Sequence, residues 1–147
     1  MKLAILTPNL SALPQPAPAD IGELADRGYR SIISNRPDGE APGQPTWTDV
    51  KAAALARGME AVHIPVTANR IDEADIRAFH EALERLPKPI AAFCRTGMRS
   101  TLLWALANEA SLTVDERIRI AAKEGYDLKP YRGLFEGATG VLASKTA

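Results

Sequence analysis

Cysteine and histidine are scarce in this sequence. Its 147 residues include one cysteine and two histidines. A single cysteine excludes an internal disulfide framework, and the lack of Cys/His clusters argues against a structural zinc site. The one cysteine, Cys94, is therefore either a small core residue or a functional thiol.

Excess charge of one sign, aromatic residues and long apolar runs are also missing. The chain carries 18 basic and 18 acidic residues, and only 5% of its residues are aromatic. Neither a nucleic-acid partner nor a membrane surface is therefore expected. No apolar run approaches the ~18 residues of a membrane-spanning helix, and Leu3–Leu6 is too short for a signal peptide. We expect a cytoplasmic protein.

The length of the chain suffices for one core without disulfides. We predict a single domain over 1–147, of which 137–147 form a flexible tail. Apolar segments of strand length alternate with amphipathic segments of helix length, which predicts an α/β fold with a mainly parallel sheet flanked by helices. Because prolines crowd the N-terminal part, its two strands are expected at an edge or as a cover, and not in the centre of the sheet.

The boundaries of the elements follow from capping and turn residues. Strands are predicted at Leu3–Leu6, Leu10–Leu13, Ser31–Asn35, Ala61–Val66 and Ile90–Cys94. Helices are predicted at Pro18–Arg27, Thr46–Arg57, Asp72–Leu86, Ser100–Asn108, from the capping box at Thr113 to Gly125, and in a short turn near Leu128–Phe135.

Cys94 ends a buried strand and precedes a helix that is apolar on every side. The unpaired amides and the dipole of a helix N-terminus stabilise an anion or a thiolate there. Arg95 and Arg99 add two positive charges, and Gly97 permits a loop whose amides converge. We predict that Cys94 is an ionised nucleophile, provided that the thiol is reachable from solvent.

Loops that follow parallel strands gather at the carboxyl ends of those strands, where ligands bind. The loops expected there are 35–45, 67–71 and 94–99. Arg36 and Asp38 are thus candidates for the rim of the cysteine pocket, although Asp38 could equally serve only its own turn. His63 is expected to be a hydrogen-bonded structural histidine.

Three motifs along Leu10–Asn108 resemble the bacterial domains called beta-lactamase-hydrolase-like, phosphatase-like. They are Ile33–Glu40 with Pro42–Pro45 behind it, His63–Val66, and Cys94–Ser100. The resemblance implies a cysteine-dependent, dual-specificity-phosphatase-like fold, with Cys94 as the nucleophile and Arg99 as the anion-binding arginine. Members of this family are described both as protein phosphatases and as rhodanese-like sulfurtransferases.

Two departures from the phosphatase pattern favour sulfur chemistry. Only four residues separate Cys94 from Arg99, whereas cysteine-dependent phosphatases resemble this loop with five, and the shorter loop is similar to that of rhodaneses. The stretch Thr67–Arg70 also lacks the carboxylate that phosphatases of this fold use as a general acid. We therefore predict a rhodanese-like sulfurtransferase that needs no cofactor.

In this hypothesis Cys94 takes a sulfur atom from thiosulfate or a persulfide and passes it to a thiol, sulfite or cyanide. The predicted anion-binding residues around it are Arg95, Thr96, Gly97, Met98 and Ser100, with Arg36 and Asp38. The alternative is a protein phosphatase with Asp38, Asp72 or Asp75 as an acid. A second alternative is a non-catalytic anion- or persulfide-binding partner of a sulfide-oxidising enzyme.

Overall fold

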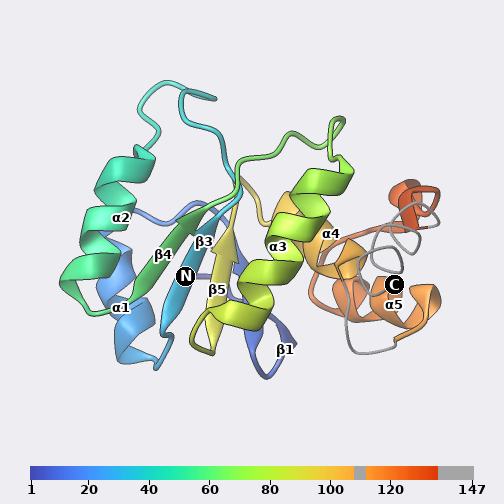
Figure 1. The fold of residues 1–147 in the computed structure, drawn as a ribbon, viewed down its shortest axis with the longest axis horizontal. Coiled ribbons are helices and arrows are strands. Elements are labelled where there is room, and N and C mark those ends of the chain that lie inside the picture. The colour runs from blue at the N-terminus through green and yellow to red at the C-terminus, as the bar shows by residue number, and fades with distance from the viewer. Residues whose placement is uncertain (108–111, 136–147) are drawn as a thin grey trace.

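The computed structural model describes residues 1–107 and 112–135, and it contains a five-stranded sheet in the order β1-β2-β5-β3-β4 (Figure 1). β1 is antiparallel to β2, and the other neighbouring strands are parallel. The fold class is therefore the predicted one. The strands are β1 (Ala4–Thr7), β2 (Leu10–Leu13), β3 (Ser31–Ser34), β4 (Glu60–His63) and β5 (Ile90–Phe93).

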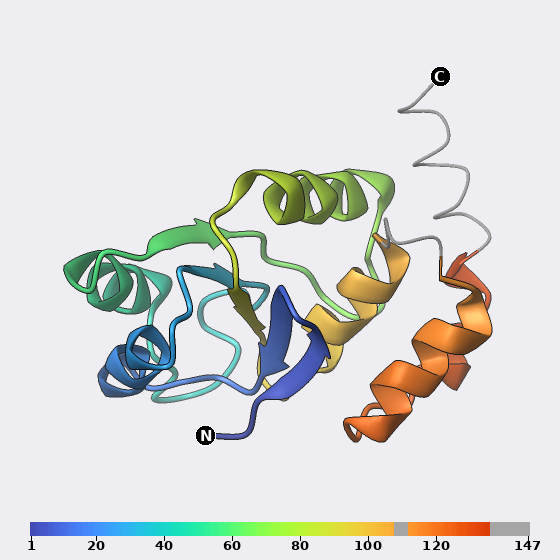
Figure 2. The ribbon, with the colours of Figure 1, turned by 90° about the horizontal axis from the view of Figure 1, so that it is seen from below.

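Helices cover both faces of this sheet, as parallel strands require. Figure 1 shows α1 and α2 on one side and α3 and α4 on the other. In Figure 2, α5 lies beyond α4 and packs on that helix instead of on the sheet. The helices are α1 (Ile21–Asp26), α2 (Trp47–Ala56), α3 (Glu73–Arg85), α4 (Met98–Leu106) and α5 (Val114–Lys123), with 3-10 turns η1 (Pro18–Asp20) and η2 (Lys129–Tyr131).

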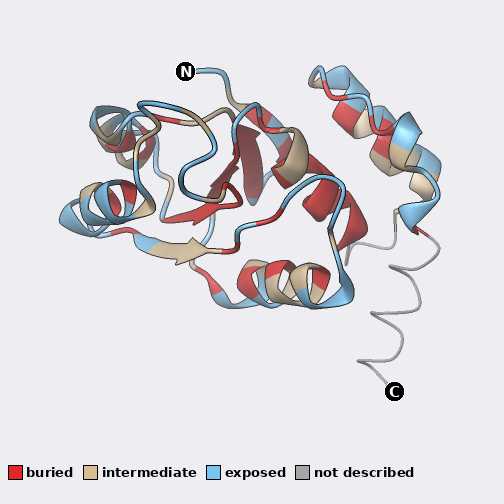
Figure 3. Ribbon diagram, turned by 90° about the horizontal axis from the view of Figure 1, so that it is seen from above, coloured by how far each residue is buried: buried red, intermediate tan, exposed pale blue. Residues whose placement is uncertain are grey.

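Alternate residues of each central strand enter two separate cores. Ile33, Ile90 and Ala92 pack with α3, α4 and α5. Ile32, Ala91 and their neighbours pack with α1 and α2. All four residues of β5 are buried, which Figure 3 shows as a fully buried strand in the middle of the sheet. The cysteine strand is thus fixed on both faces.

The prediction that Leu10–Leu13 forms an edge or cover is wrong. β2 lies inside the sheet, antiparallel to β1 and parallel to β5, and all four of its residues are buried. The prolines that suggested an edge begin at Pro14, after the strand has ended, so they remove no hydrogen bond from the ladder. Of the two N-terminal strands, only β1 lies at an edge of the sheet.

Local capping signals give the helix ends correctly, with one exception near the cysteine. Thr113 and Glu116 form the expected capping box of α5. The helix predicted from Ser100 begins instead at Met98, because Gly97 takes a left-handed conformation and serves as its N-cap. The predicted end at Asn108 and the predicted tail lie outside the described residues.

Phe79 on α3 provides a test of the larger core. Its side chain is fully buried between α3 and the sheet, so Phe79→Ala should lower the free energy of unfolding by about 3–5 kcal/mol. Leu55→Ala on α2 is the control, because Leu55 is 55% exposed and its truncation should cost less than about 0.5 kcal/mol. Denaturant unfolding followed by circular dichroism measures both, and equal losses would contradict the described packing.

Candidate functional site

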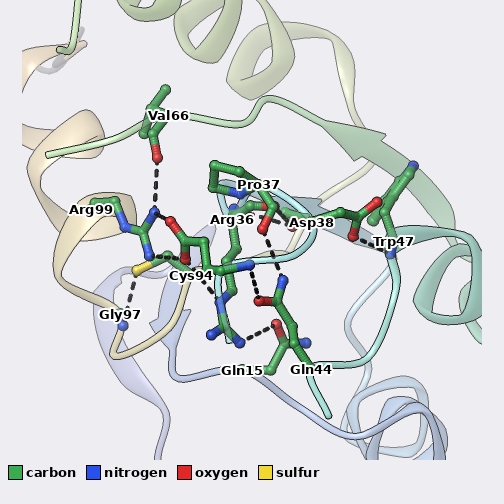
Figure 4. Close-up of polar contacts among 12 residues, drawn as sticks. Gln15, Arg36, Pro37, Asp38, Gln44, Trp47, Val66, Cys94, Gly97 and Arg99 are labelled. Atoms are coloured by element: carbon green, nitrogen blue, oxygen red, sulfur yellow. Dashed lines mark hydrogen bonds and ion pairs between the residues drawn. The ribbon is translucent and has the colours of Figure 1, made fainter. Parts of the chain in front are cut away.

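Cys94 lies directly after β5, at the point where the loop turns into α4. The amide of Gly97 donates a hydrogen bond to its Sγ at 3.1 Å, and Figure 4 shows this contact beside Arg99. The thiol is only 1% exposed, so the condition that it be reachable from solvent is not met in this conformation. A backbone amide and a guanidinium thus both lie beside the sulfur atom.

The backbone of the loop bonds the sulfur through the Gly97 amide and leads directly into the first turn of α4. Gly97 has φ of 97°, a conformation that residues with a Cβ rarely adopt. α4 starts immediately afterwards, so the amides of Arg99 and Ser100 in its first turn have no acceptor within the helix. The positive end of the α4 dipole is therefore directed at the cysteine loop.

Arg99 returns from the first turn of α4 over the cysteine. Its Nη1 donates to Glu40 Oε2 at 2.7 Å and to the carbonyl of Val66 at 2.9 Å, and its Nη2 donates to Glu40 Oε1 at 2.8 Å. The guanidinium thus binds a carboxylate through the same fork that would fit two oxygens of an oxyanion. The hydrogen bonds with Glu40, and to a smaller extent the interaction with Cys94, raise the pKa of Arg99.

Glu40 is a site residue for which the sequence analysis assigned no role. It joins Arg99 to Arg36, whose Nε donates to Glu40 Oε1 at 3.0 Å while its Nη1 donates to Gln15 at 3.2 Å. These hydrogen bonds, foremost that from Arg99, lower the pKa of Glu40 despite its partial burial. An acidic residue four positions after Arg36 was the only sequence signal, and it did not show that Arg99 lies across from it.

Asn35 is a second residue that sequence reasoning missed. It is completely buried, and its Nδ2 donates to the carbonyl of Ile64 at 2.9 Å while its Oδ1 accepts from the Ser100 hydroxyl at 2.7 Å. Its backbone amide also bonds the carbonyl of Phe93 at the end of β5. Through its side chain and its backbone amide, this one residue therefore ties together the ends of three strands and the first turn of α4.

The three aspartates considered as acids all hold backbone amides. Asp38 Oδ1 accepts from the amide of Trp47, at the start of α2, at 2.9 Å. Asp72 and Asp75 form the reciprocal capping box of α3, and burial is the main reason that the pKa of Asp75 is raised. Asp38 lies on the same loop as Glu40, but its carboxylate is directed to α2, not to the cysteine.

The remaining predicted residues divide into those near the thiol and those at the rim. Arg36 is 5% exposed and bonded to Glu40. Arg95 and Thr96 are exposed on the outer side of the loop, and the carbonyl of Arg95 accepts from the Gln15 amide at 3.2 Å. The Met98 amide donates to the Thr96 hydroxyl. The structure thus gathers Cys94, Arg99, Arg36 and Ser100, and leaves Arg95 facing outward.

His63 has the structural role expected from its place at the end of β4. Its Nε2 lies 2.9 Å from the carbonyl of Arg36, and its ring stacks on Trp47 at a centroid distance of 5.0 Å. The hydrogen bond ties the loop that carries Glu40 to β4, and the stacking ties β4 to α2.

Two kinds of site are not found in the part of the chain that the structure describes. Within 1–107 and 112–135, no three His, Cys, Asp or Glu side chains are grouped so that they could hold a metal ion. No helix in these ranges has the length and apolarity needed to cross a membrane. The cysteine loop with Arg99, Arg36 and Glu40 is therefore the candidate site that we consider further.

Known proteins similar to this chain are phosphatase-like. The model of the family "Beta-lactamase hydrolase-like protein, phosphatase-like domain" matches residues 2–111. A beta-lactamase hydrolase-like protein of Agrobacterium fabrum is 43% identical over 72% of this chain, which spans about a quarter (25%) of that relative. A structure from Neisseria meningitidis Z2491, described as a "putative phosphatase", is 35% identical, covers 94% of this chain and 99% of its own, and has a TM-score of 0.84.

The wider fold group is also that of cysteine-dependent phosphatases. PTPMT1 matches with a TM-score of 0.73 over 98% of each chain, at 15% identity, which shows the fold alone. The prediction of a rhodanese-like sulfurtransferase is wrong, because the family model and the Neisseria structure point to the phosphatase alternative. The chain belongs to the family of beta-lactamase hydrolase-like proteins, in their phosphatase-like domain.

Proposed function

We propose that this domain hydrolyses phosphoric monoesters with Cys94 as the nucleophile. The thiolate attacks phosphorus, the bond to the ester oxygen breaks, and a phosphocysteine forms. Water then cleaves the phosphorus–sulfur bond and releases phosphate and the thiolate. The observation that carries this proposal is the hydrogen bond of the Gly97 amide to the Cys94 sulfur at the N-terminus of α4, with the Arg99 guanidinium beside that sulfur.

The arrangement of charges fits a phosphoryl group better than a neutral substrate. The first-turn amides of α4 and the guanidinium of Arg99 surround the place where equatorial phosphoryl oxygens would lie once phosphorus approaches the sulfur. Arg99 presents a planar fork that matches two such oxygens. A dianionic monoester therefore gains charged hydrogen bonds in this cradle that a neutral substrate would not.

Glu40 occupies the position on Arg99 that the phosphoryl group of the substrate would take. Its carboxylate occupies the Arg99 fork at 2.7 and 2.8 Å, and the thiol beneath is buried. Because the pKa of Glu40 is lowered, the carboxylate stays charged at neutral pH. We propose that an incoming phosphate displaces Glu40 from Arg99, while Arg36 remains as its partner. The negative charge of the substrate thus releases Arg99 from Glu40 and gives the phosphoryl group access to the cysteine loop.

The identity of the leaving group follows from the state of the nearby carboxylates. Asp38, Asp72 and Asp75 are engaged with backbone amides, and a charged Glu40 has no proton to donate. An ester whose oxygen leaves readily as an anion needs no donor, whereas an alkoxide does. We therefore propose aryl phosphates, such as a phosphotyrosine side chain, as the substrate class.

The first experiment measures phosphate release by the purified protein from an aryl phosphate and from an alkyl phosphate. We expect kcat/KM to be at least about 100-fold higher for the aryl ester, the scale of one missing general acid. Cys94→Ser should abolish turnover of both, and Ser11→Ala is the matched control, because the Ser11 hydroxyl bonds Tyr29 and not the loop. Aryl phosphate turnover that survives in Cys94→Ser would contradict the proposal.

Arg99 and Arg95 should respond differently to the same conservative change. Arg99→Lys removes the planar fork and should lower kcat/KM by about 100-fold or more, while Arg95→Lys should lower it by less than about fivefold, because Arg95 is exposed and acts only by attracting anions. Steady-state kinetics at two salt concentrations separates the effects. Equal losses in the two variants would show that Arg99 holds no substrate oxygens.

Replacement of Glu40 tests whether it competes with substrate. Glu40→Gln removes the charged occupant of the Arg99 fork, so inorganic phosphate should inhibit the variant at an about tenfold lower concentration. Glu23→Gln is the control, because Glu23 pairs with Arg27 at an exposed position on α1. Weaker phosphate inhibition in Glu40→Gln would mean that Glu40 orients Arg99 instead of competing with the ligand.

Glu40 should also leave a signature in the pH dependence of stability. Its lowered pKa means that the ion pair stabilises the fold above the ordinary value of 4.5 and that this contribution is lost as pH falls through the lowered value. The free energy of unfolding of the wild type should therefore exceed that of Glu40→Gln at pH 7, and the difference should be smaller at pH 4, below the ordinary value of 4.5. Denaturant titrations at the two pH values provide the comparison.

A further inference from the structure

A single peptide group separates Cys94 from a buried tyrosine. The Tyr126 hydroxyl donates to the carbonyl of Thr96 at 2.9 Å. The amide on the other side of the same peptide, that of Gly97, donates to Cys94 Sγ at 3.1 Å. In a trans peptide the carbonyl oxygen and the amide hydrogen point in opposite directions within one rigid plane. The Tyr126 hydroxyl and the Cys94 sulfur therefore bond to opposite sides of the same rigid peptide group.

The tyrosine reaches this peptide only because residue 97 is a glycine. A Cβ on Gly97 would lie 2.1 Å from the Tyr126 hydroxyl oxygen and 3.3 Å from the backbone of Leu13. Tyr126 itself is 6% exposed, and its own amide bonds the carbonyl of Ala121 at the end of α5. The contact is close-packed and anchored from α5.

Glycine also creates the need for an anchor. Because Gly97 has no Cβ, positive and negative φ are about equally accessible to it, so the peptide between residues 96 and 97 could rotate at little cost. Rotation would turn the amide away from the sulfur and bring the carbonyl oxygen toward it. A donor on Thr96 opposes that rotation, and by polarising the carbonyl it strengthens the amide as a donor.

We propose that Tyr126 is a positioning residue for the nucleophile, which holds the 96–97 peptide so that the Gly97 amide stabilises the Cys94 thiolate. Burial, together with the nearby Cys94 and Glu124, raises the pKa of Tyr126, so that the hydroxyl remains a donor over the working pH range. Tyr126 follows α5 and lies beyond residues 2–111, the part that the family model matches. The segment after α4 therefore completes the cysteine loop.

The test is the pH profile of Cys94 alkylation by iodoacetamide in the full chain, compared between wild type, Tyr126→Phe and Tyr29→Phe. Tyr29 is the matched control, because its hydroxyl bonds Ser11 at 2.6 Å on another part of the sheet. For Tyr126→Phe we expect the profile to move to higher pH, so that alkylation at pH 6.5 slows about fivefold, the scale of one hydrogen bond, while the plateau at high pH is unchanged. A purely structural role would alter the plateau and the melting temperature but not the midpoint.

A second measurement uses the wild type, so it does not depend on whether Tyr126→Phe folds well. In the wild type, the amide proton of Gly97, observed by NMR in a 15N-labelled sample, should shift as the thiol titrates, because the sulfur is its acceptor. The inference as it bears on turnover rests on the proposed phosphatase function, and there kcat for an aryl phosphate should fall with KM unchanged. The alkylation profile and the amide shift do not require turnover, so they test the positioning role of Tyr126 even if the phosphatase proposal fails. The inference would be overturned if the alkylation profile of Tyr126→Phe had the same pH midpoint as that of the wild type. It would also be overturned if the chemical shift of the Gly97 amide proton did not change as the thiol titrates.

Discussion

The left-handed backbone at Gly97 is the constraint on which the whole site depends. With φ of 97°, this residue ends the loop and caps α4, so that the helix begins two residues before the apolar pattern predicts. The same conformation directs one amide at Cys94 Sγ and leaves space for the Tyr126 hydroxyl behind the loop. Neither contact would survive a side chain at this position, because the tyrosine already fills the space that a Cβ would take.

Charge around the loop is balanced by partners from other strands. Arg99 and Arg36 share one carboxylate, that of Glu40, which comes from the loop after β3. Asn35, at the start of that loop, bonds both Ser100 and the chain after β4. The loop that holds the countercharge is thereby tied to the helix that holds the arginine. Binding of an oxyanion then amounts to the exchange of one acceptor for another at a guanidinium that is already oriented.

Features set by neighbouring residues could be predicted from the sequence, and features set by distant contacts could not. The capping box of Thr113 is local, and so is the strand-to-helix junction that places Cys94 beside Arg99. The interior position of β2 depends on its pairing with β5, and the roles of Glu40 and Tyr126 depend on how separate segments meet. The number of residues between Cys94 and Arg99 was also a poor guide, because it favoured sulfur transfer, whereas the family model and the Neisseria structure are phosphatase-like.

The central place of β5 has a consequence for the order in which the sheet can assemble during synthesis. β5 lies between β2 and β3, which do not pair with each other, and residues as distant as Leu10 and Ile90 are partners across it. A nascent chain that ends before Ile90 thus holds two separate two-stranded pieces with open edges. Such long-range pairing slows folding. The strand that leads to Cys94 joins these pieces, so this cysteine takes its position only at the step that completes the sheet.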